Sequence, residues 1–317
     1  MISLVKGYTR KLIDNFLGKY EYRLLNNKHL AYYEDFAINI LKEVERTMDN
    51  KEIESIVFSK DRAMQLHAFL ASYIERVSNR GRMYILYKCT NQRHQKSYDQ
   101  LKEGFAGEDF VFIEEKEFRK QLIDICEQSG AGKIMFYVDD MIFTHKIDYA
   151  VLGGINTAES ILSLSRGKDM DFSIVLQKPL VLPPFTSEEN NLERFSWNYL
   201  KEFSEWTYPL GVSGYMYGRI EVLAMLKSIS FKAPNSLEIS MQIYLPYYIR
   251  RSGLCTKFAA CVCVHANLVQ SEIENPTLGT YSIEELLILW EKGKRINIHE
   301  FYDTPISETQ IKAYTFV

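Results

Sequence analysis

The sequence has 317 residues, of which 46% are hydrophobic and 13% aromatic, so it is long and apolar enough to bury at least one large core. The formal net charge is −3, from 38 basic and 41 acidic residues, which argues against nucleic acid as a partner. No stretch approaches the roughly 20 consecutive apolar residues that a membrane-spanning helix needs.

The N-terminal residues, 1–50, have helical periodicity, and "AYYEDFAINILKEVERTM" is the clearest amphipathic segment. The first 25 residues lack the long apolar core of a signal peptide, but they place apolar side chains at helical spacing among Lys and Arg. We expect a helix packed on its own domain, with peripheral contact to a membrane surface as the alternative.

Strands and helices alternate after residue 50. The strands are expected in "IESIVFS", "RMYILYKC", "DFVFIEE" and "KIMFYVDDMIF". The helices are expected in "RAMQLHAFLASYIERV" and in "FRKQLIDICEQSG", the second ending at Gly130. This alternation predicts an α/β fold with a mostly parallel central sheet flanked by helices.

Polar residues gather where these strands end, and ligands of such sheets bind beyond the carboxyl ends of the strands. The residues at the strand ends are Ser59, Lys60, Asp61, Arg62, Lys88, Glu114, Asp139 and Asp140. The adjacent carboxylates of Asp139 and Asp140 leave a buried run and would repel each other, so we expect a positive group beside them. Such a pair also suits Mg²⁺ or Mn²⁺, although an Asp that only caps a turn is the alternative.

The pattern weakens beyond residue 150. Asn156, with Glu159 three residues later and Gly167 beyond, predicts a capped helix. An extended, proline-broken segment follows, and then the aromatic segment "RFSWNYLKEFSEWTYPLGVSGYMY", which we interpret as a wall or lid. Three of its side chains could stack on a sugar or simply pack: Trp206, Tyr208 and Tyr215.

Two more capped helices are expected near the C-terminus. Asn235 and Glu238 have the spacing of a capping box, which explains Glu238 structurally; the alternative is that Glu238 is a general base. Ser282 and Glu285 form a second capping box, with Gly293 as the stop.

The five cysteines are odd in number and lack Cys-x-x-Cys spacing, so we expect neither a disulfide framework nor a zinc site, and a reducing compartment. Cys261 and Cys263 would share one face of a strand in "KFAACVCVHANLVQ". His265, at the end of that strand, is either a packed histidine or a nitrogen donor to a metal or diphosphate.

Taken in order, "VFSKDRAMQL", "YVDDMIF", "SLSRGK", "WTYPLGVSGYMY" and "PNSLE" resemble a bacterial nucleotide-sugar glycosyltransferase of the GT-A fold, similar to glycosyltransferase family 2. The resemblance runs from about Ile53 to Gln270. Its most specific element is Val138-Asp139-Asp140, which matches the DXD-type metal motif of the family except that Val138 replaces the first acidic residue.

The resemblance implies a catalytic domain at 51–270, between helical extensions at 1–50 and 271–317. It implies a cytoplasmic enzyme, free or peripheral on the inner face of the membrane, of cell-surface polysaccharide biosynthesis. With Mn²⁺ or Mg²⁺, the enzyme would move a sugar from a nucleoside diphosphate donor to a glycan or lipid-linked acceptor. The alternatives are a sugar nucleotidyltransferase, which typically needs a Gly-rich loop absent from "VFSKDRAMQL", and a non-catalytic nucleotide-sugar- or carbohydrate-binding protein.

The resemblance and the residue patterns above together predict roles for individual residues. Asp140, Asp139 and His265 would hold the metal, and Glu238 would be the catalytic residue. Trp206, Tyr208 and Tyr215 would bind the acceptor. The nucleotide sugar would contact Ser59, Lys60, Asp61, Arg62, Lys88, Asp139 and Arg166.

Overall fold

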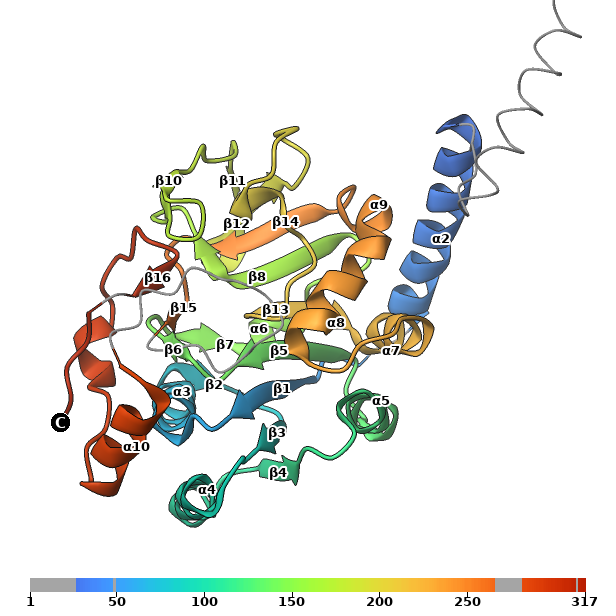
Figure 1. The fold of residues 1–317 in the computed structure, drawn as a ribbon. Helices are drawn as coiled ribbons and strands as arrows, with labels where there is room; N and C mark the ends of the chain where they lie inside the picture. Colours follow the sequence, from blue (N-terminus) through green and yellow to red (C-terminus); the bar gives the residue numbers. More distant parts are fainter. Residues whose placement is uncertain (1–26, 48–49, 266–280, 312) are drawn as a thin grey trace, which may run out of the picture. The chain divides into compact units, whose positions relative to one another are not determined.

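The computed structural model describes residues 27–47, 50–265, 281–311 and 313–317 (Figure 1). The chain divides into two compact units, Met1–Leu41 and Lys42–Val317. Helix α2 (Asn27–Thr47) confirms the amphipathic helix expected before residue 50. The basic segment formed by the first 25 residues lies outside the described residues.

The second unit is built on a nine-stranded sheet with the order β11-β12-β14-β8-β13-β5-β1-β3-β4. Its strands are β1 (Ile53–Lys60), β3 (Met83–Lys88), β4 (Phe110–Glu114), β5 (Lys133–Val138), β8 (Ser160–Gly167), β11 (Thr186–Ser187), β12 (Leu192–Ser196), β13 (Tyr215–Gly218) and β14 (Ser252–Thr256). Only β12 and β13 run opposite to the other strands of this sheet. The predicted α/β fold with a mostly parallel sheet is confirmed.

Helices cover both faces of the sheet (Figure 1). Side chains alternate along β1, so Val57 packs with α3 (Ala63–Arg76) and α4 (Gln92–Gly104) in one core. Ile56 and Phe58 pack in the other core, with α5 (Phe118–Gln128), α7 (Arg219–Ser228) and α8 (Pro234–Met241). Burial on both faces explains the uninterrupted apolar runs 56–58 in β1 and 134–138 in β5.

A second, three-stranded sheet joins the middle of the chain to its end. Strand β15 (Cys261–Val264) pairs antiparallel with β6 (Met141–Phe143) and parallel with β16 (Gln310–Ile311). Helix α10 (Ile283–Glu291) packs on α3 and α4. The described part of the predicted 271–317 extension therefore packs within the same compact unit as the sheet.

The remaining elements are short. They are β2 (Val77–Ser78), β7 (Ile147–Asp148), α6 (Tyr149–Leu152), β9 (Phe172–Ser173), β10 (Lys178–Pro179), α9 (Leu245–Tyr248) and four 3₁₀ turns at Glu189–Asn191, Glu205–Thr207, Gln242–Tyr244 and Ile298–Phe301. No helix in the described part of the chain is both long and apolar enough to span a membrane.

The helix predicted to begin at Asn156 is wrong, because residues 160–167 form strand β8. The Asn156 side chain accepts a hydrogen bond from the Ala158 N–H (3.0 Å), which closes a local turn rather than a helix cap. Ile161, Leu162 and Leu164 are buried in the middle of the sheet, so tertiary burial decided the structure here.

Two further differences concern helix ends and a missed helix. Helix α5 ends at Gln128, and Ser129 is already extended (φ −60°, ψ 133°), so Gly130 is not its C-cap. Helix α4 was not expected; Asn91 caps it by accepting from the His94 N–H (3.0 Å). The Ser282–Glu285 capping box is confirmed, and Gly293 adopts φ +81° just beyond α10.

Candidate functional site

A cavity of about 450 Å³ opens at the carboxyl ends of β1, β3 and β5. Residues from these strand ends that line it include Ser59, Lys60, Arg62, Lys88, Asp139 and Asp140. The predicted convergence of polar side chains at this edge is therefore confirmed for these six residues. Glu114 is exposed and its neighbour Glu115 lines the cavity instead, in an ion pair with Lys88 (Nζ to Oε1, 3.0 Å).

Arg62 is the positive group expected beside the two aspartates. Its Nη1 lies 3.0 Å from Asp139 Oδ1 and 3.0 Å from Asp140 Oδ2. All three side chains are buried, so the guanidinium compensates charges that would otherwise be costly in this position.

Asp139 is bound more tightly into the protein than Asp140. Its Oδ2 accepts from the Ser59 hydroxyl at 2.8 Å and from the Lys60 N–H at 3.4 Å. Burial raises the pKa of Asp139 to about 6, against the opposing effect of Arg62, and the neighbouring Asp140 adds to the rise. Because both of its oxygens are engaged, Asp139 fits a positioning role better than the metal role that the sequence predicted.

The backbone N–H groups at the end of β1 and just after it are not available to bind an anion. These three N–H groups already donate within the protein: Lys60 to Asp139, Asp61 to the Lys88 carbonyl (3.1 Å) and Arg62 to the Tyr98 hydroxyl (3.3 Å). Asp61 adopts φ +54°, and its Oδ1 accepts from the Thr90 N–H (2.8 Å). Asp61 does not line the cavity, contrary to its predicted nucleotide contact, because it fastens β1 to the segment after β3.

Asp140, Cys263 and His265 bring three potential metal-ligand atoms within 4.8 Å of one another. All three residues line the cavity. The backbone fixes their spacing, because Val264 donates to the Asp140 carbonyl (2.6 Å) and β15 pairs with β6, which begins just after Asp140. The predicted proximity of Asp140 and His265 is confirmed as geometry. A carboxylate with an imidazole suits Mn²⁺ better than Mg²⁺, which prefers oxygen ligands.

Glu238 lines the same cavity from α8, and the structure removes its predicted capping role. The N-cap of α8 is Ala233 and the N3 residue is Ser236, whose hydroxyl accepts from the Ala233 N–H (3.0 Å). Glu238 Oε2 instead accepts from the Val212 N–H at 3.0 Å. Burial raises the pKa of Glu238 above its usual value, although Val212, Tyr208 and Arg166 oppose this. A carboxylate with a raised pKa is a stronger base.

The aromatic segment supplies a wall through its backbone loop rather than its rings. Val212 and Ser213 line the cavity, and the Gln242 side chain holds the adjacent Leu210 carbonyl (2.8 Å). Gly214 has φ +80°, and a Cβ atom there would lie 3.1 Å from Cys261 Sγ, so this turn needs glycine.

Four more of the predicted contact residues do not line the cavity. Trp206 and Tyr215 are 0% and 2% exposed in the core beneath this wall, which leaves no surface for an acceptor. Tyr208 is half-buried, and its hydroxyl accepts from Gln242 (3.0 Å). Arg166 pairs with Glu205 (3.6 Å) and does not line the cavity. The predictions for the three aromatic residues relied on composition, which does not distinguish a core from a site. The prediction for Arg166 relied on the family resemblance of "SRGK".

Sequence reasoning missed three cavity residues that carry a charge or a thiol: Cys263, Glu115 and Lys232. The alternation in "CVCVH" already places Cys263 and His265 on one face of a strand, so that signal was available. Lys232 precedes α8 and joins Lys60, Arg62 and Lys88 as the cations of a lining that also carries four carboxylates, Glu115, Asp139, Asp140 and Glu238. The cations can donate charge-assisted hydrogen bonds to anionic groups of a ligand.

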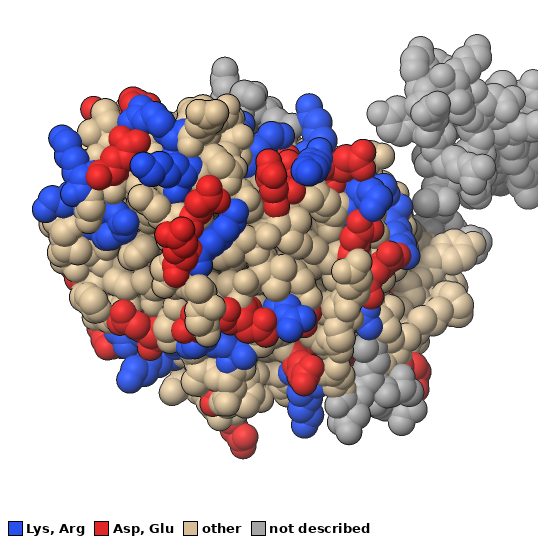
Figure 2. Space-filling model, turned by 90° about the horizontal axis from the view of Figure 1, so that it is seen from below, with Lys and Arg blue, Asp and Glu red and all other residues tan. Residues whose placement is uncertain are grey.

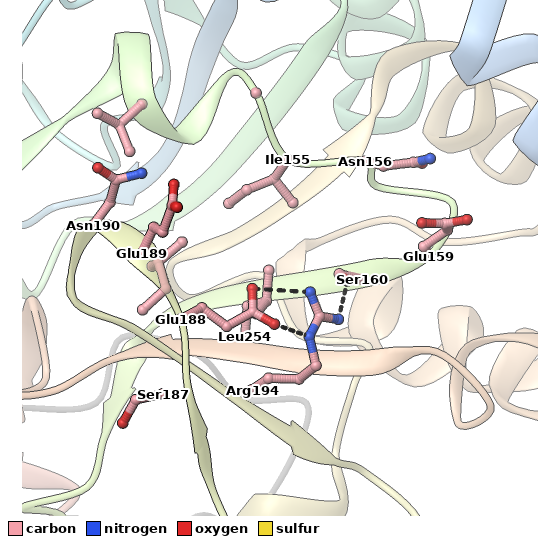
Figure 3. Close-up of a pocket in the computed structure, with 13 residues that line it drawn as sticks. Ile155, Asn156, Glu159, Ser160, Ser187, Glu188, Glu189, Asn190, Arg194 and Leu254 are labelled. Carbon is pink, nitrogen blue, oxygen red and sulfur yellow. Dashed lines mark hydrogen bonds and ion pairs between the residues drawn. The ribbon is translucent and has the colours of Figure 1, made fainter.

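A second, wider cavity of about 820 Å³ lies over β8, β12 and β14 (Figure 3). Its cationic side chain, Arg194, donates to Ser160 (2.8 Å) and to both oxygens of Glu188. Glu159 and Glu189 add two more carboxylates to the lining. This acidic surface suits a nucleoside diphosphate poorly, so the cavity at the strand ends is the better candidate despite its smaller volume.

The surface charges do not form an area of one sign on the face shown in Figure 2, where Lys and Arg lie beside Asp and Glu. This mixed pattern agrees with the net charge of −3.

The fold and site define an α/β protein with a cavity of mixed charge at the carboxyl ends of the strands and a side-chain cluster that could hold a divalent cation. No family model matches the sequence. The chain is similar to the bifunctional glycosyltransferase pgtA of Dictyostelium discoideum, with 23% identity over 293 residues. The match covers 80% of this chain and 37% of pgtA, so the chain spans well under half the length of that relative.

Likenesses to solved structures are partial. One is S. aureus TarS 1–349 in complex with UDP-GlcNAc, with a TM-score of 0.42, 12% identity and coverage of 70% of this chain and 60% of TarS 1–349. Another is a nucleotidyl transferase from Methanothermobacter, with a TM-score of 0.34, 10% identity and coverage of 65% and 87%. With scores this low, the fold assignment depends on the topology of the sheet itself.

Removing Arg62 should destabilise the protein strongly. Arg62→Ala leaves two buried carboxylates without their cation, and breaking a buried ion pair from one side typically costs about 3–5 kcal/mol. The free energy of unfolding in urea would measure this. The matched control is Arg93→Ala, which also removes an arginine that bridges two carboxylates, Glu284 and Glu291, but in an exposed position. Because exposed ion pairs contribute little to stability, this variant should lose much less stability than Arg62→Ala. Equal losses would contradict the role of Arg62 as the counter-charge.

Proposed function

We propose that this protein is a metal-dependent glycosyltransferase of the GT-A type, which moves a sugar from a nucleoside diphosphate donor to a glycan or lipid-linked acceptor. The observation that carries the proposal is one cavity at the strand ends that combines three features. These are the cations Lys60, Arg62, Lys88 and Lys232, the cluster of Asp140 and His265, and the carboxylate of Glu238. The sequence similarity to a protein named as a glycosyltransferase supports the same class.

In this proposal the cationic side chains bind the diphosphate, since lysine and arginine donate charge-assisted hydrogen bonds to phosphate oxygens. A divalent cation at Asp140 and His265 supplies Lewis-acid stabilisation of the leaving diphosphate when bound. Asp139 and Ser59 fix Arg62, and thereby the orientation of Asp140.

Glu238 takes the proton of the acceptor hydroxyl in an inverting reaction. Two features prepare it for this step: partial burial, which raises its pKa, and the Val212 N–H, which orients one oxygen. In this proposal the acceptor enters beside the Val212–Ser213 wall, because the aromatic rings expected to bind it are packed below that wall.

A sugar nucleotidyltransferase fits the site less well. Such an enzyme typically holds its triphosphate on a glycine-rich loop, whereas the loop after β1 has no glycine and its N–H groups at residues 60–62 donate within the protein. We therefore assign phosphate binding to side chains and to the cation. Cytoplasmic location, with or without peripheral membrane contact, and a role in cell-surface polysaccharide synthesis are parts of the same proposal.

A thermal-shift panel of nucleoside diphosphates, with and without Mn²⁺, tests the donor class. A ligand that binds only the folded protein raises its melting temperature, by an amount that corresponds to about 2.7 kcal/mol at 100 times Kd. We expect at least one nucleoside diphosphate to stabilise the protein, and to do so more strongly with Mn²⁺. No shift with any member of the panel would contradict the proposal. Saturable binding without transfer or donor hydrolysis, across a panel of acceptors, would favour a non-catalytic binding protein.

A further inference from the structure

Cys263 lies in the candidate metal cluster although the sequence had excluded the cysteines from metal binding. Along β15 the side chains alternate, so Cys261, Cys263 and His265 share a face. Cys261 is fully buried in the core, whereas Cys263 and His265 are half-buried and line the cavity. The strand therefore presents a sulfur and an imidazole to the cavity next to Asp140.

The spacing of the three side chains fits one cation. Two ligands of the same ion lie no farther apart than the sum of their bond lengths, about 4.4 Å for a thiolate sulfur and an imidazole nitrogen. The donor atoms of Asp140, Cys263 and His265 all lie within 4.8 Å of one another, so small side-chain rotations bring them into range.

The backbone around the cluster is held in place. Cys263 is in register with Met141 across the β15–β6 pair, and the Val264 N–H donates to the Asp140 carbonyl at 2.6 Å. A rigid support of this kind keeps a ligand set assembled before the ion arrives.

We propose that Cys263 is the third protein ligand of the cation held by Asp140 and His265, and that its sulfur makes the site selective for transition-metal ions over Mg²⁺. Thiolate and imidazole ligands favour ions such as Zn²⁺ and Co²⁺, whereas Mg²⁺ prefers oxygen. On coordination Cys263 gives up its thiol proton to solvent, and no electron is transferred. This inference deepens the proposed function, since it concerns the metal site on which that function depends.

Titration of the full-length, metal-free protein with Co²⁺ tests this directly, without donor or acceptor. A cobalt–thiolate bond produces a charge-transfer absorption band in the near ultraviolet, which oxygen and nitrogen ligands do not produce. We expect the band in the wild-type protein and in Cys89→Ser, which removes the other half-buried cysteine away from the cluster. We expect the band to be absent from Cys263→Ser, with the far-ultraviolet circular dichroism unchanged.

Affinities measured by calorimetry give a second readout. Cys263→Ser should weaken Zn²⁺ and Co²⁺ binding by at least about tenfold, since losing even an outer-shell partner costs that much. Its Mg²⁺ affinity should change less than about twofold, because Mg²⁺ makes little use of sulfur.

A wild-type protein that binds Co²⁺ without the band, or a Cys263→Ser variant that keeps the band, would overturn the proposal even if glycosyl transfer is demonstrated. If the protein shows the band but binds no nucleoside diphosphate, the proposed function would be contradicted and the proposed metal site would be supported.

Discussion

Asp140→Ala should abolish the part of nucleoside diphosphate binding that depends on Mn²⁺, while the protein remains folded. Asp140 is the carboxylate that reaches both Arg62 and the cluster with Cys263 and His265. Removing a direct ligand should lower the affinity for the metal by at least ~100-fold. This is the upper end of the loss seen when only an outer-shell partner of a ligand is removed. Arg62 keeps its contact with Asp139 at 3.0 Å, so the buried guanidinium is still paired.

The measurement is nucleotide affinity by calorimetry with and without Mn²⁺, using the nucleoside diphosphate that stabilises the wild-type protein most. Asp139→Asn is the matched control, because it changes the adjacent carboxylate, whose oxygens are bound to Ser59 and Arg62. It should retain the Mn²⁺ dependence that Asp140→Ala loses. The reverse result would return the metal site to Asp139, as the sequence motif alone allowed.

Glu238→Gln should reduce transfer by ~10²–10⁴-fold, the usual contribution of a general base, with little change in melting temperature or donor affinity. Glutamine is isosteric and its amide oxygen can still accept from the Val212 N–H, so the local structure is kept. It cannot take a proton from an acceptor at neutral pH. The readouts are the transfer rate with an identified acceptor and, in parallel, the affinity for the donor.

Ser236→Ala is the control, because Ser236 and not Glu238 is the N3 residue whose side chain accepts from the N-cap N–H of α8. It should lower the stability of the protein by ~1 kcal/mol, the typical net contribution of one hydrogen bond, and leave the transfer rate unchanged. Near wild-type turnover by Glu238→Gln would remove Glu238 from the chemistry. Because it is not a helix cap, its contact with Val212 would then be its remaining role.

The site could be predicted in part because parallel strands bring their carboxyl ends to one edge. That rule correctly grouped Ser59, Arg62, Lys88 and the two aspartates from separate parts of the chain. It failed for Asp61, because a residue at a strand end can also turn away from the cavity and bind a neighbouring loop.

Predictions from local sequence patterns were wrong most often where one pattern has both a structural and a functional explanation. Asn235 and Glu238 have capping-box spacing, but the helix begins at Pro234, with Ala233 as its cap, and this moves Glu238 out of position N3. The aromatic composition around Trp206 and Tyr215 fits a sugar-stacking wall, yet both rings fill the core. Burying a large ring stabilises the folded protein, because it removes a large apolar area from water.

The sequence by itself determined the alternation of strands and helices from residue 53 to residue 143 except for helix α4. It also determined the Ser282–Glu285 cap and the need for a cation beside Asp139 and Asp140, because periodicity, capping and charge repulsion act over a few residues. Only the tertiary structure decided that Arg62 is this cation, that residues 160–167 form a central strand, and that Cys263 and His265 meet Asp140. These outcomes depend on the pairing of segments more than 70 residues apart, such as Asp140 with β15 or Arg62 with Asp139, and on burial from both faces of the sheet. Local propensity contains no information about which distant strand a residue will face.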